Sequence, residues 1–274
     1  MSESGYKLRH FINKPVRDVL GPATSKSIYH IQRNSNLPTD RPLIFACTHQ
    51  CKDDIACGLA STGRHTYLLF ASLLDFYGTL DGFALWTNGV ILVDRKDKNS
   101  RKAAIPKMKY AIEMGADILM YPEGTLNKTK NLIVQKLFPG IYHLAKDTNA
   151  LIVPMAIIQE DKNVYSKVCE PFDICKFEKE AGLNKLRDIM ATAKYELMEK
   201  YSKISRSEIK NTELFWENAI DELVDSMMPY YDFEIENSSQ YIDKNETTYE
   251  QAFEHLKTIS PNLKTAFLFN KKYC

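Results

Sequence analysis

Short apolar runs alternate with segments of helical periodicity through the middle of the chain. The apolar runs predict strands, and they lie at Leu43–Cys47, Tyr67–Phe70, Val90–Val93, Ile118–Tyr121 and Leu151–Ile158. Between several of them apolar residues recur at the spacing of a helix, at Asp53–Ser61, Ser100–Met114 and Gly140–Thr148. Strands that are apolar at nearly every position are typical of sheets covered on both faces. We therefore expect an α/β fold, with a central, mostly parallel or mixed sheet flanked by helices.

The pattern differs at the two ends of the chain. The first 36 residues mix basic and apolar positions at roughly helical spacing, in two short pieces divided near Pro15 and Gly21-Pro22. After Pro171 the strand pattern fades, and amphipathic helices are predicted at Leu183–Tyr201 and Thr212–Met228. We thus expect a helical N-terminal arm at residues 1–36, an α/β domain at 37–175 and a mainly helical C-terminal extension at 176–274.

The N-terminal arm has two interpretations. Its apolar residues, among them Leu8, Phe11 and Val19, fit a segment that covers part of the core. Basic residues such as Lys7 and Arg9 lie between them, and this mixture also fits an amphipathic segment that docks on anionic lipid headgroups. The sequence leaves both interpretations open.

The composition is that of an ordinary globular protein. Of 274 residues, 44% are hydrophobic and 26% are charged, and 36 basic against 35 acidic residues leave a net charge of +1. These values exclude a disordered or collagen-like chain, and the near-neutral charge disfavours nucleic acid as a partner.

Membrane-spanning and secreted proteins are disfavoured as well. The mean hydropathy is -0.34, and the longest apolar stretch, residues 66–93, is interrupted by Asp75 and Asp81. We expect neither a transmembrane helix nor a signal peptide, and we expect the six cysteines to be reduced thiols in the cytoplasm.

Residues with catalytic chemistry follow the first predicted strand. A histidine at a strand end suits general base catalysis when a carboxylate holds its imidazole in one tautomer. His49 and Asp54 are such a pair, provided that a turn between strand and helix brings them together. Asp53 competes for the same role, or for that of a helix cap.

Cys51 adds two alternatives to this site. It could act as a nucleophile, although a catalytic cysteine usually takes its histidine from a distant segment. Together with Cys47, Cys57 and His49 it could also form a zinc cluster, although the spacing is not that of a zinc finger. We expect Cys47 and Cys57 to be small core residues, and we expect no bound metal.

Two later strands also end in residues that suit binding. Arg95 stands just beyond the Val90–Val93 run, where its guanidinium can bind a phosphate or a carboxylate, or else pair with Asp94 or Asp97. After the fourth run, the turn Glu123-Gly124-Thr125 offers a tight bend, a hydroxyl and free backbone N–H groups. Such a turn can hold an anion or order a neighbouring side chain.

These residues stand in an order that resembles a known family. The chain shows His-x4-Asp, then Gly-x4-Asp-Arg, then Pro-Glu-Gly-Thr, then Ile152-Val153-Pro154, each expected at a strand end, between about Pro42 and Ile158. This arrangement is similar to that of the glycerolipid acyltransferases, which include bacterial 1-acylglycerol-3-phosphate acyltransferases. By this resemblance His49 and Asp54 are the catalytic pair. Arg95, Glu123, Gly124 and Thr125 match the blocks linked to acceptor binding, and Pro154 matches the block associated with the acyl donor.

The resemblance implies a reaction and a location. The reaction is transfer of a fatty acyl group from acyl-CoA or an acyl carrier protein, used as co-substrate, to a hydroxyl of a lysophospholipid in phospholipid biosynthesis. No bound cofactor is implied. A lipid acceptor implies in turn that the chain works as a peripheral protein at the cytoplasmic, inner face of a membrane.

Three positions depart from the family pattern. Thr48 stands where asparagine is common, Cys51 where serine is common, and Leu126 where an arginine often completes Glu-Gly-Thr-Arg. The lost guanidinium favours an acceptor without a phosphate monoester, unless Lys128, Lys130 or Lys136 replaces it. A non-catalytic lipid-binding protein on the same fold is a further alternative.

Overall fold

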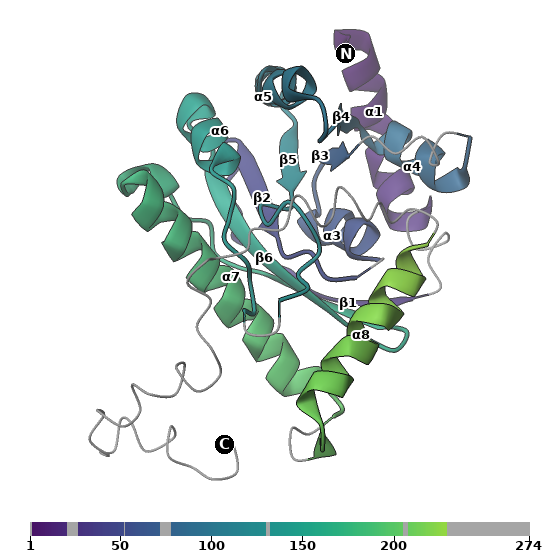
Figure 1. The fold of residues 1–274 in the computed structure, drawn as a ribbon. Coiled ribbons are helices and arrows are strands. Elements are labelled where there is room, and N and C mark those ends of the chain that lie inside the picture. Colours follow the sequence, from purple (N-terminus) through teal and green to yellow (C-terminus); the bar gives the residue numbers. More distant parts are fainter. Residues whose placement is uncertain are drawn as a thin grey trace.

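A mixed seven-stranded sheet with helices on both faces forms the centre of the computed structural model (Figure 1), among the residues that it describes: 2–20, 27–51, 53–71, 78–129, 132–204 and 208–228. The strands are β1 (Ile28–Gln32), β2 (Leu43–Cys47), β3 (Thr66–Ala71), β4 (Val90–Val93), β5 (Asp117–Met120), β6 (Leu151–Glu160) and β7 (Asn163–Val168).

The helices alternate with these strands. They are α1 (Glu3–Pro15), the π-helical turn η1 (Val16–Leu20), α3 (Asp54–Thr62), α4 (Leu80–Asn88), α5 (Lys98–Glu113), α6 (Gly140–Thr148), the 3-10 turn η3 (Ile174–Lys176), α7 (Lys179–Tyr201) and α8 (Thr212–Met227). Among the described residues, none of the helices combines the length and the apolar character needed to cross a membrane.

The strand order in the sheet is β1-β7-β6-β2-β5-β3-β4. The pairs from β6 through β2, β5 and β3 to β4 are all parallel, whereas β7 runs antiparallel to β6 and carries β1 parallel to itself at the edge. The expectation of a mostly parallel or mixed sheet flanked by helices is confirmed. Because the central strands are parallel, the segments that follow β2, β4 and β5 all leave the sheet at the same edge.

Both faces of the sheet are buried, as the fully apolar runs predicted. In β2 the side chains alternate, so that Leu43 and Phe45 pack in the cluster under α3 and α4, while Ile44 and Ala46 pack in the cluster under α5, α6 and α7. All five residues of β2 have an exposed fraction of 0%. The strand that precedes the candidate site is therefore held rigidly in the middle of the molecule.

Three of the strands and α-helices were not predicted. β7 alternates buried and half-buried positions, and β1 is a largely exposed edge strand, so neither has the continuous apolar run that marks the central strands. The third, α4, lies inside the longest apolar stretch, where residues are apolar on several sides and the helical period is weak. β1 also corrects one expectation, because residues 28–32 are a strand of the sheet and not part of a helical arm.

The remaining terminal predictions have mixed outcomes. The N-terminal helix is present, and it ends at Pro15 in a π-helical turn, close to the predicted break. Both predicted C-terminal helices are confirmed as α7 and α8. The second predicted break, at Gly21-Pro22, and the last part of the predicted extension, residues 229–274, lie outside the described residues.

Candidate active site

His49 and Asp54 come together in the turn between β2 and α3. The Nδ1 atom of His49 lies 2.7 Å from Oδ2 of Asp54, and the same oxygen accepts hydrogen bonds from the backbone N–H groups of Gln50 (2.9 Å) and Cys51 (3.2 Å). The Asp54 side chain is 1% exposed and that of His49 is 18% exposed. Since Nδ1–H donates to the carboxylate, Nε2 is left with the lone pair that a general base needs.

Asp53, the competing acid, makes a different contact. Its Oδ2 accepts a hydrogen bond of 2.5 Å from the hydroxyl of Ser27, just before β1, and its side chain does not cap α3. Asp54 is thus the acid that orients the imidazole, and Asp53 fastens the start of α3 to the edge of the sheet.

Tyr121 supports this pair from the end of β5. Its ring centroid lies 4.7 Å from that of His49, and its hydroxyl donates to the backbone carbonyl of Asp54 over 2.9 Å. Gly58 of α3 makes room for that hydroxyl, because a Cβ at this position would lie 3.0 Å from it. Nothing in the local sequence singled out Tyr121, since its contacts are with residues far away in the chain.

Glu123 lies inside the protein, behind the backbone of His49. It is fully buried, with Oε1 accepting from the backbone N–H of His49 (3.1 Å) and Oε2 from that of Gln135 (2.9 Å). Burial raises the pKa of this carboxyl, and the positive charge of Lys194 acts in the opposite direction. Glu123 therefore braces the backbone of the candidate base, and its contact with an acceptor stays a prediction.

The backbone of His49 is held from its other side by the same loop. The N–H of Asn127 donates to the His49 carbonyl over 3.1 Å. The Asn127 side chain in turn donates to the carbonyls of Leu132 (2.8 Å) and Ile133 (3.1 Å). Asn127 and Gln135 were not predicted, because only folding brings this loop beside the turn after β2.

Arg95 and Gly124 are neighbours, although they follow different strands. A guanidinium N–H of Arg95 donates to the carbonyl of Gly124. Gly124 has φ of 72°, and a Cβ there would lie 2.5 Å from the ring of Phe138, so no other residue fits without rearrangement. Both residues are partly exposed, whereas Thr125 is buried. Of the predicted acceptor-binding residues, Arg95 and Gly124 thus lie where a substrate can approach.

Leu126 explains how the chain departs from the Glu-Gly-Thr-Arg pattern. Its side chain is 1% exposed and belongs to the core. An arginine in this position would need a different course of the chain to reach solvent. Of the lysines considered as substitutes, Lys136 is exposed, Lys128 is half-buried and Lys130 lies outside the described residues.

The cysteines near the site are core residues. Cys47, Cys51 and Cys57 are buried, and burial raises the pKa of each thiol, to about 11 for Cys57. A protonated thiol is a weak nucleophile, so these cysteines are poorly suited to covalent catalysis. Among the described residues no three His, Cys, Asp or Glu side chains are grouped so that they could hold a metal ion.

Thr48 and Pro154 join the site to β6. The Thr48 hydroxyl accepts from the N–H of Ile157 over 3.0 Å, so the residue in the usual asparagine position ties the turn to the sheet. Pro154 lies within β6, opposite Ala46 of β2. Its expected place at a strand end was wrong, because β6 continues to Glu160.

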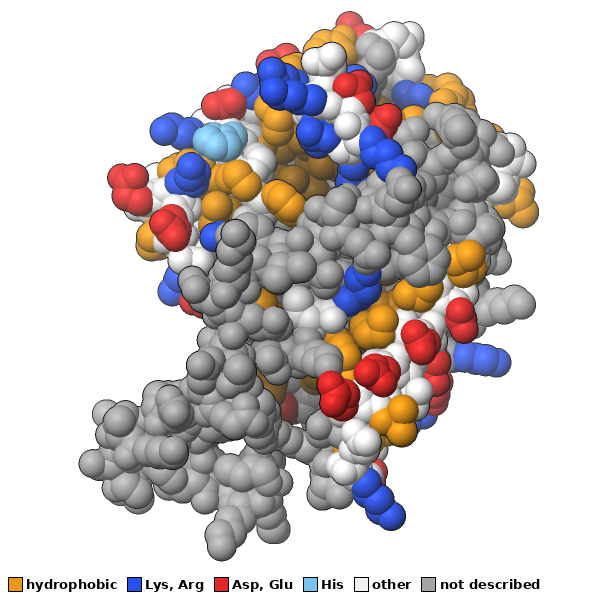
Figure 2. Space-filling model, viewed as in Figure 1, with side chains coloured by type: hydrophobic (Ala, Val, Ile, Leu, Met, Phe, Trp, Pro, Cys, Tyr) orange, Lys and Arg blue, Asp and Glu red, His pale blue; other side chains and the backbone are white. Residues whose placement is uncertain are grey.

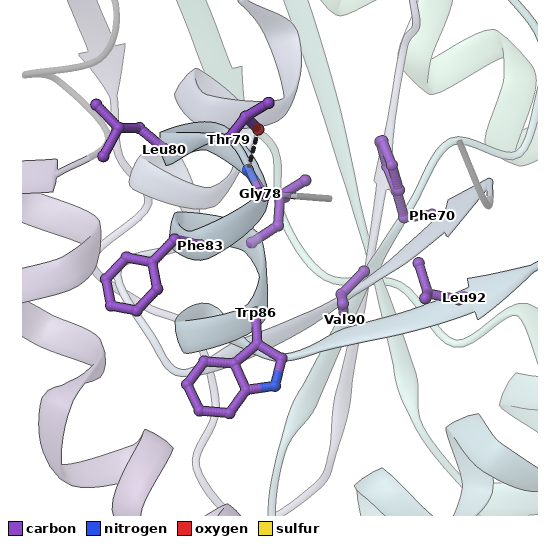
Figure 3. A pocket seen from close by; sticks show the side chains of 10 residues that line it. Phe70, Gly78, Thr79, Leu80, Phe83, Trp86, Val90 and Leu92 are labelled. Carbon is purple, nitrogen blue, oxygen red and sulfur yellow. Dashed lines mark hydrogen bonds between the residues drawn. The ribbon is translucent and has the colours of Figure 1, made fainter. Parts of the chain in front are cut away.

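An apolar cavity of about 540 Å³ opens between α4 and the ends of β3 and β4 (Figure 3). Phe70, Val90 and Leu92 line its sheet side, and Leu80, Phe83 and Trp86 of α4 lie opposite. Phe70 packs against the same buried cluster as Cys51 and Tyr121, and Leu92 precedes Arg95 by only three residues. The cavity and the turn that carries the candidate base thus lie against the same apolar cluster.

Comparison with known proteins relates this chain to acyltransferases. The acyltransferase family model matches residues 29–158. A chloroplastic 1-acyl-sn-glycerol-3-phosphate acyltransferase of Brassica napus is 28% identical over 162 residues, which are 57% of this chain and 44% of that protein. A 1-acyl-sn-glycerol-3-phosphate acyltransferase of Chlamydomonas reinhardtii is 22% identical over 153 residues, 55% of this chain and again 44% of the relative. The match thus spans less than half the length of these relatives.

A solved structure shares the fold. The 1-acyl-sn-glycerophosphate acyltransferase of Thermotoga maritima superposes with a TM-score of 0.57 at 18% identity, over 71% of this chain and 83% of that one. The arrangement of sheet and helices is therefore one already seen in a solved structure.

Proposed function

Since residues 29–158 form a domain of the acyltransferase family, we propose that the chain transfers a fatty acyl group from an acyl thioester to a hydroxyl of a lysophospholipid, such as 1-acylglycerol-3-phosphate. The observation that carries the proposal is the contact of 2.7 Å between His49 and Asp54, with the imidazole partly exposed and the carboxylate buried behind it. A chain that only bound lipid would have no need of an oriented base.

The proposed reaction needs no acyl-enzyme. Nε2 of His49 takes the proton of the acceptor hydroxyl, while Asp54 stabilises the imidazolium that forms. The acceptor oxygen attacks the thioester carbonyl, and the tetrahedral intermediate collapses by breaking the C–S bond. The thiolate leaves and takes the proton from His49, so that an ester and a free thiol are the products and the base is restored.

The apolar cavity supports a substrate with an alkyl chain. Its lining is almost wholly apolar, and it lies beside the cluster that holds Cys51 and Tyr121. Figure 2 shows Lys and Arg side chains around a hollow with an apolar floor below α5, a combination that suits a lipid with an anionic headgroup. We propose that the apolar cavity between α4 and the strands β3 and β4 takes a fatty chain, with acyl-CoA or an acyl carrier protein as the donor.

The exposed faces of α1 and α4 support peripheral attachment to a membrane. Phe11 of α1 is 84% exposed and Leu80 of α4 is 76% exposed, and the two helices pack on each other (Figure 1). Arg9 joins them, since its Nε–H donates to the Trp86 carbonyl and its guanidinium lies 5.0 Å from the centre of the indole ring. We propose that this combined face enters the headgroup region of the cytoplasmic leaflet.

A second acceptor class has an observation in its favour. Leu126 is buried where an arginine would serve a phosphate monoester, so a glycolipid or another polar lipid with a free hydroxyl fits the same chemistry.

A thiol-release assay separates these possibilities. Purified chain is given long-chain acyl-CoA or acyl carrier protein thioester with lysophosphatidate, a monoacylglycerol or a lysoglycolipid, and the lipid product is identified. Release that depends on lysophosphatidate supports the first proposal, and release only with an acceptor that lacks phosphate supports the second. Lipid binding without release of thiol from any donor would exclude an acyltransferase.

A further inference from the structure

A single lysine on α7 reaches the interior behind the candidate active site. Lys194 is 4% exposed, and it lies on the face of the helix that buries Met190, Ala193 and Leu197. An ammonium group costs several kcal/mol to bury unless other groups compensate its charge. The groups around Lys194 therefore have to compensate its buried charge.

The Lys194 ammonium is bonded to the loop that holds His49. Its Nζ donates to the carbonyl of Ile133 over 3.0 Å, and the side chain of Asn127 donates to the same carbonyl over 3.1 Å. The backbone N–H of Asn127 donates to the carbonyl of His49. One continuous path of hydrogen bonds thus joins the C-terminal helix to the backbone of the candidate base.

Glu123 supplies the compensating charge. Burial lowers the pKa of Lys194 and raises that of Glu123, and the attraction between the two charges opposes both shifts. Each oxygen of the fully buried Glu123 carboxylate accepts a backbone N–H, one from His49 and one from Gln135. Hydrogen bonds from N–H groups are stronger to a carboxylate than to a protonated carboxyl, so the two bonds favour the ionised form.

From these contacts we infer that Lys194 is a positioning residue, which keeps Glu123 ionised and the segment 132–135 in place, and so holds the backbone of His49. The C-terminal extension thereby becomes part of the catalytic unit. The kinetic part of the inference rests on the proposed function, whereas its structural part does not.

The charges facing this pair come from three elements. Lys194 projects from α7, Glu123 follows β5, and Asp54, which also acts on the ammonium, begins α3. The thiols of Cys47 and Cys51 are close enough to act on it as well, but burial raises the pKa of both and keeps them neutral. His49 acts on Glu123 as well, but less than Lys194 does. Loss of Lys194 would therefore remove the buried ammonium from beside Glu123, whereas Asp54 would keep its contact with His49.

The kinetic test compares four single variants. Lys194→Met removes the charge and the donor, Lys194→Gln removes the charge but keeps a donor, Lys194→Arg keeps both, and Lys185→Met changes an exposed lysine of the same helix. We expect Lys194→Met and Lys194→Gln to lower kcat roughly 10- to 100-fold with KM nearly unchanged, as expected when a reacting group is displaced slightly. Lys194→Arg should recover most of kcat, and Lys185→Met should match the wild type.

A double variant tests whether the effect passes through Glu123. In a Glu123→Gln background, where no ionisable group remains at this position, Lys194→Met should lower kcat by a smaller factor than in the wild-type background, because only the bond to the Ile133 carbonyl is then lost. Independent, multiplied losses would overturn the inference. Only variants that give a folded circular dichroism spectrum and unfold cooperatively enter the comparison of kcat. If Lys194→Met does not fold, Lys194→Gln takes its place in both backgrounds.

An NMR titration tests the same inference without any acyl transfer. The amide protons of His49 and Gln135 should shift together when Glu123 is protonated, because both donate to its carboxylate. We expect the midpoint of that shift to rise by about one pH unit in Lys194→Met, since an opposite charge has been removed. An unchanged midpoint would overturn the inference, whereas a risen midpoint in a chain without transferase activity would sustain it and refute the proposed function.

Discussion

The side chains around His49 have definable tasks. Asp54 binds Nδ1 of the imidazole, Tyr121 packs on the ring and binds the Asp54 carbonyl, and Glu123 binds the N–H of His49. The His49 side chain is partly exposed, so its imidazole can meet a substrate, whereas Asp54 and Glu123 are buried. The catalytic role of His49 can therefore be tested separately from the contacts that hold it in place.

Replacement of His49 by alanine should abolish acyl transfer and leave the fold intact. General base catalysis contributes about 10²- to 10⁴-fold, so the rate of thioester turnover with acceptor should fall by at least that factor. Steady-state thiol release measures the rate, and thermal unfolding checks the fold. A rate within a few-fold of the wild type would remove His49 from the mechanism.

Replacement of Cys51 by serine should leave most of the activity. Its thiol is buried and burial raises its pKa, so it is not a nucleophile in the proposed reaction. We expect kcat within about threefold of the wild type, together with some loss of stability from burying a hydroxyl. Mass spectrometry of the enzyme mixed with acyl donor provides the second measurement, and an acylated cysteine would contradict direct transfer.

At the scale of elements, different helices contribute different side chains to the site and to the surface. The helix α3 presents Asp54 at its first turn, α7 inserts Lys194 beneath the site, and α1 and α4 together present exposed apolar side chains. The sequence suggested the membrane role for α1 alone. The contact between α1 and α4 enlarges that face and places it beside the apolar cavity.

Polar substitutions on α1 should weaken attachment to membranes. Leu8 and Phe11 are exposed, and each would gain about 1.5–3 kcal/mol on full burial in an apolar phase. The double variant Leu8→Ser/Phe11→Ser should therefore sediment with anionic liposomes at least tenfold more weakly, while its activity on detergent-dispersed substrate stays unchanged. The matched control is Leu214→Ser/Phe215→Ser, which alters two exposed apolar residues of α8.

The liposome experiment has a clear contrary outcome. If the α1 and α8 variants sediment equally well, the apolar face of α1 does not dock on the bilayer. Substitution is preferable to deletion of the first 36 residues, because deletion would also remove β1 from the edge of the sheet.

At the scale of the whole molecule, one sheet gathers all the chemistry at one edge. The parallel strands β2, β4 and β5 deliver His49, Arg95 and Glu123 to the same side, although these residues are far apart in sequence. At the opposite end of the parallel strands, a polar contact joins the sheet to α1. There the Nδ1 atoms of His65 and His10 lie 3.3 Å apart, and Nε2 of His65 lies 3.0 Å from the carbonyl oxygen of Asn88.

The joint between His10 and His65 should make stability depend on pH. Burial lowers the pKa of His65 from its ordinary 6.5 to about 4, so between these values the unfolded chain binds a proton that the folded chain does not. The free energy of unfolding contributed by His65 is fully present above pH 6.5 and is lost as the pH falls toward 4.

Denaturant unfolding at pH 7 and pH 4.5 measures that loss. The wild type should lose roughly 1–3 kcal/mol more than His65→Gln between these pH values, because the variant has no imidazole to protonate in the unfolded chain. The control is His30→Gln, which changes an exposed histidine of β1 and should behave as the wild type. Equal losses in wild type and His65→Gln would refute the assignment.

Much of this protein is determined by its sequence alone. The central strands and α6 were predicted closely because a strand buried on both faces needs apolar residues throughout, and an amphipathic helix needs them at a period of 3.6. The pairing of His49 with Asp54 was also predictable, since both lie in one short turn. The family followed from four motifs in order, which the comparison with known proteins supports.

The tertiary structure decided what no local pattern contains. It selected Asp54 over Asp53, turned Glu123 inward as a brace, buried Leu126, and brought Lys194 from the C-terminal helix to the loop behind His49. In the sequence, Lys194 is only a charge on the apolar face of a helix. The physical reason is that burial and electrostatic pairing depend on which distant segments meet, and only the folded sheet brings them together.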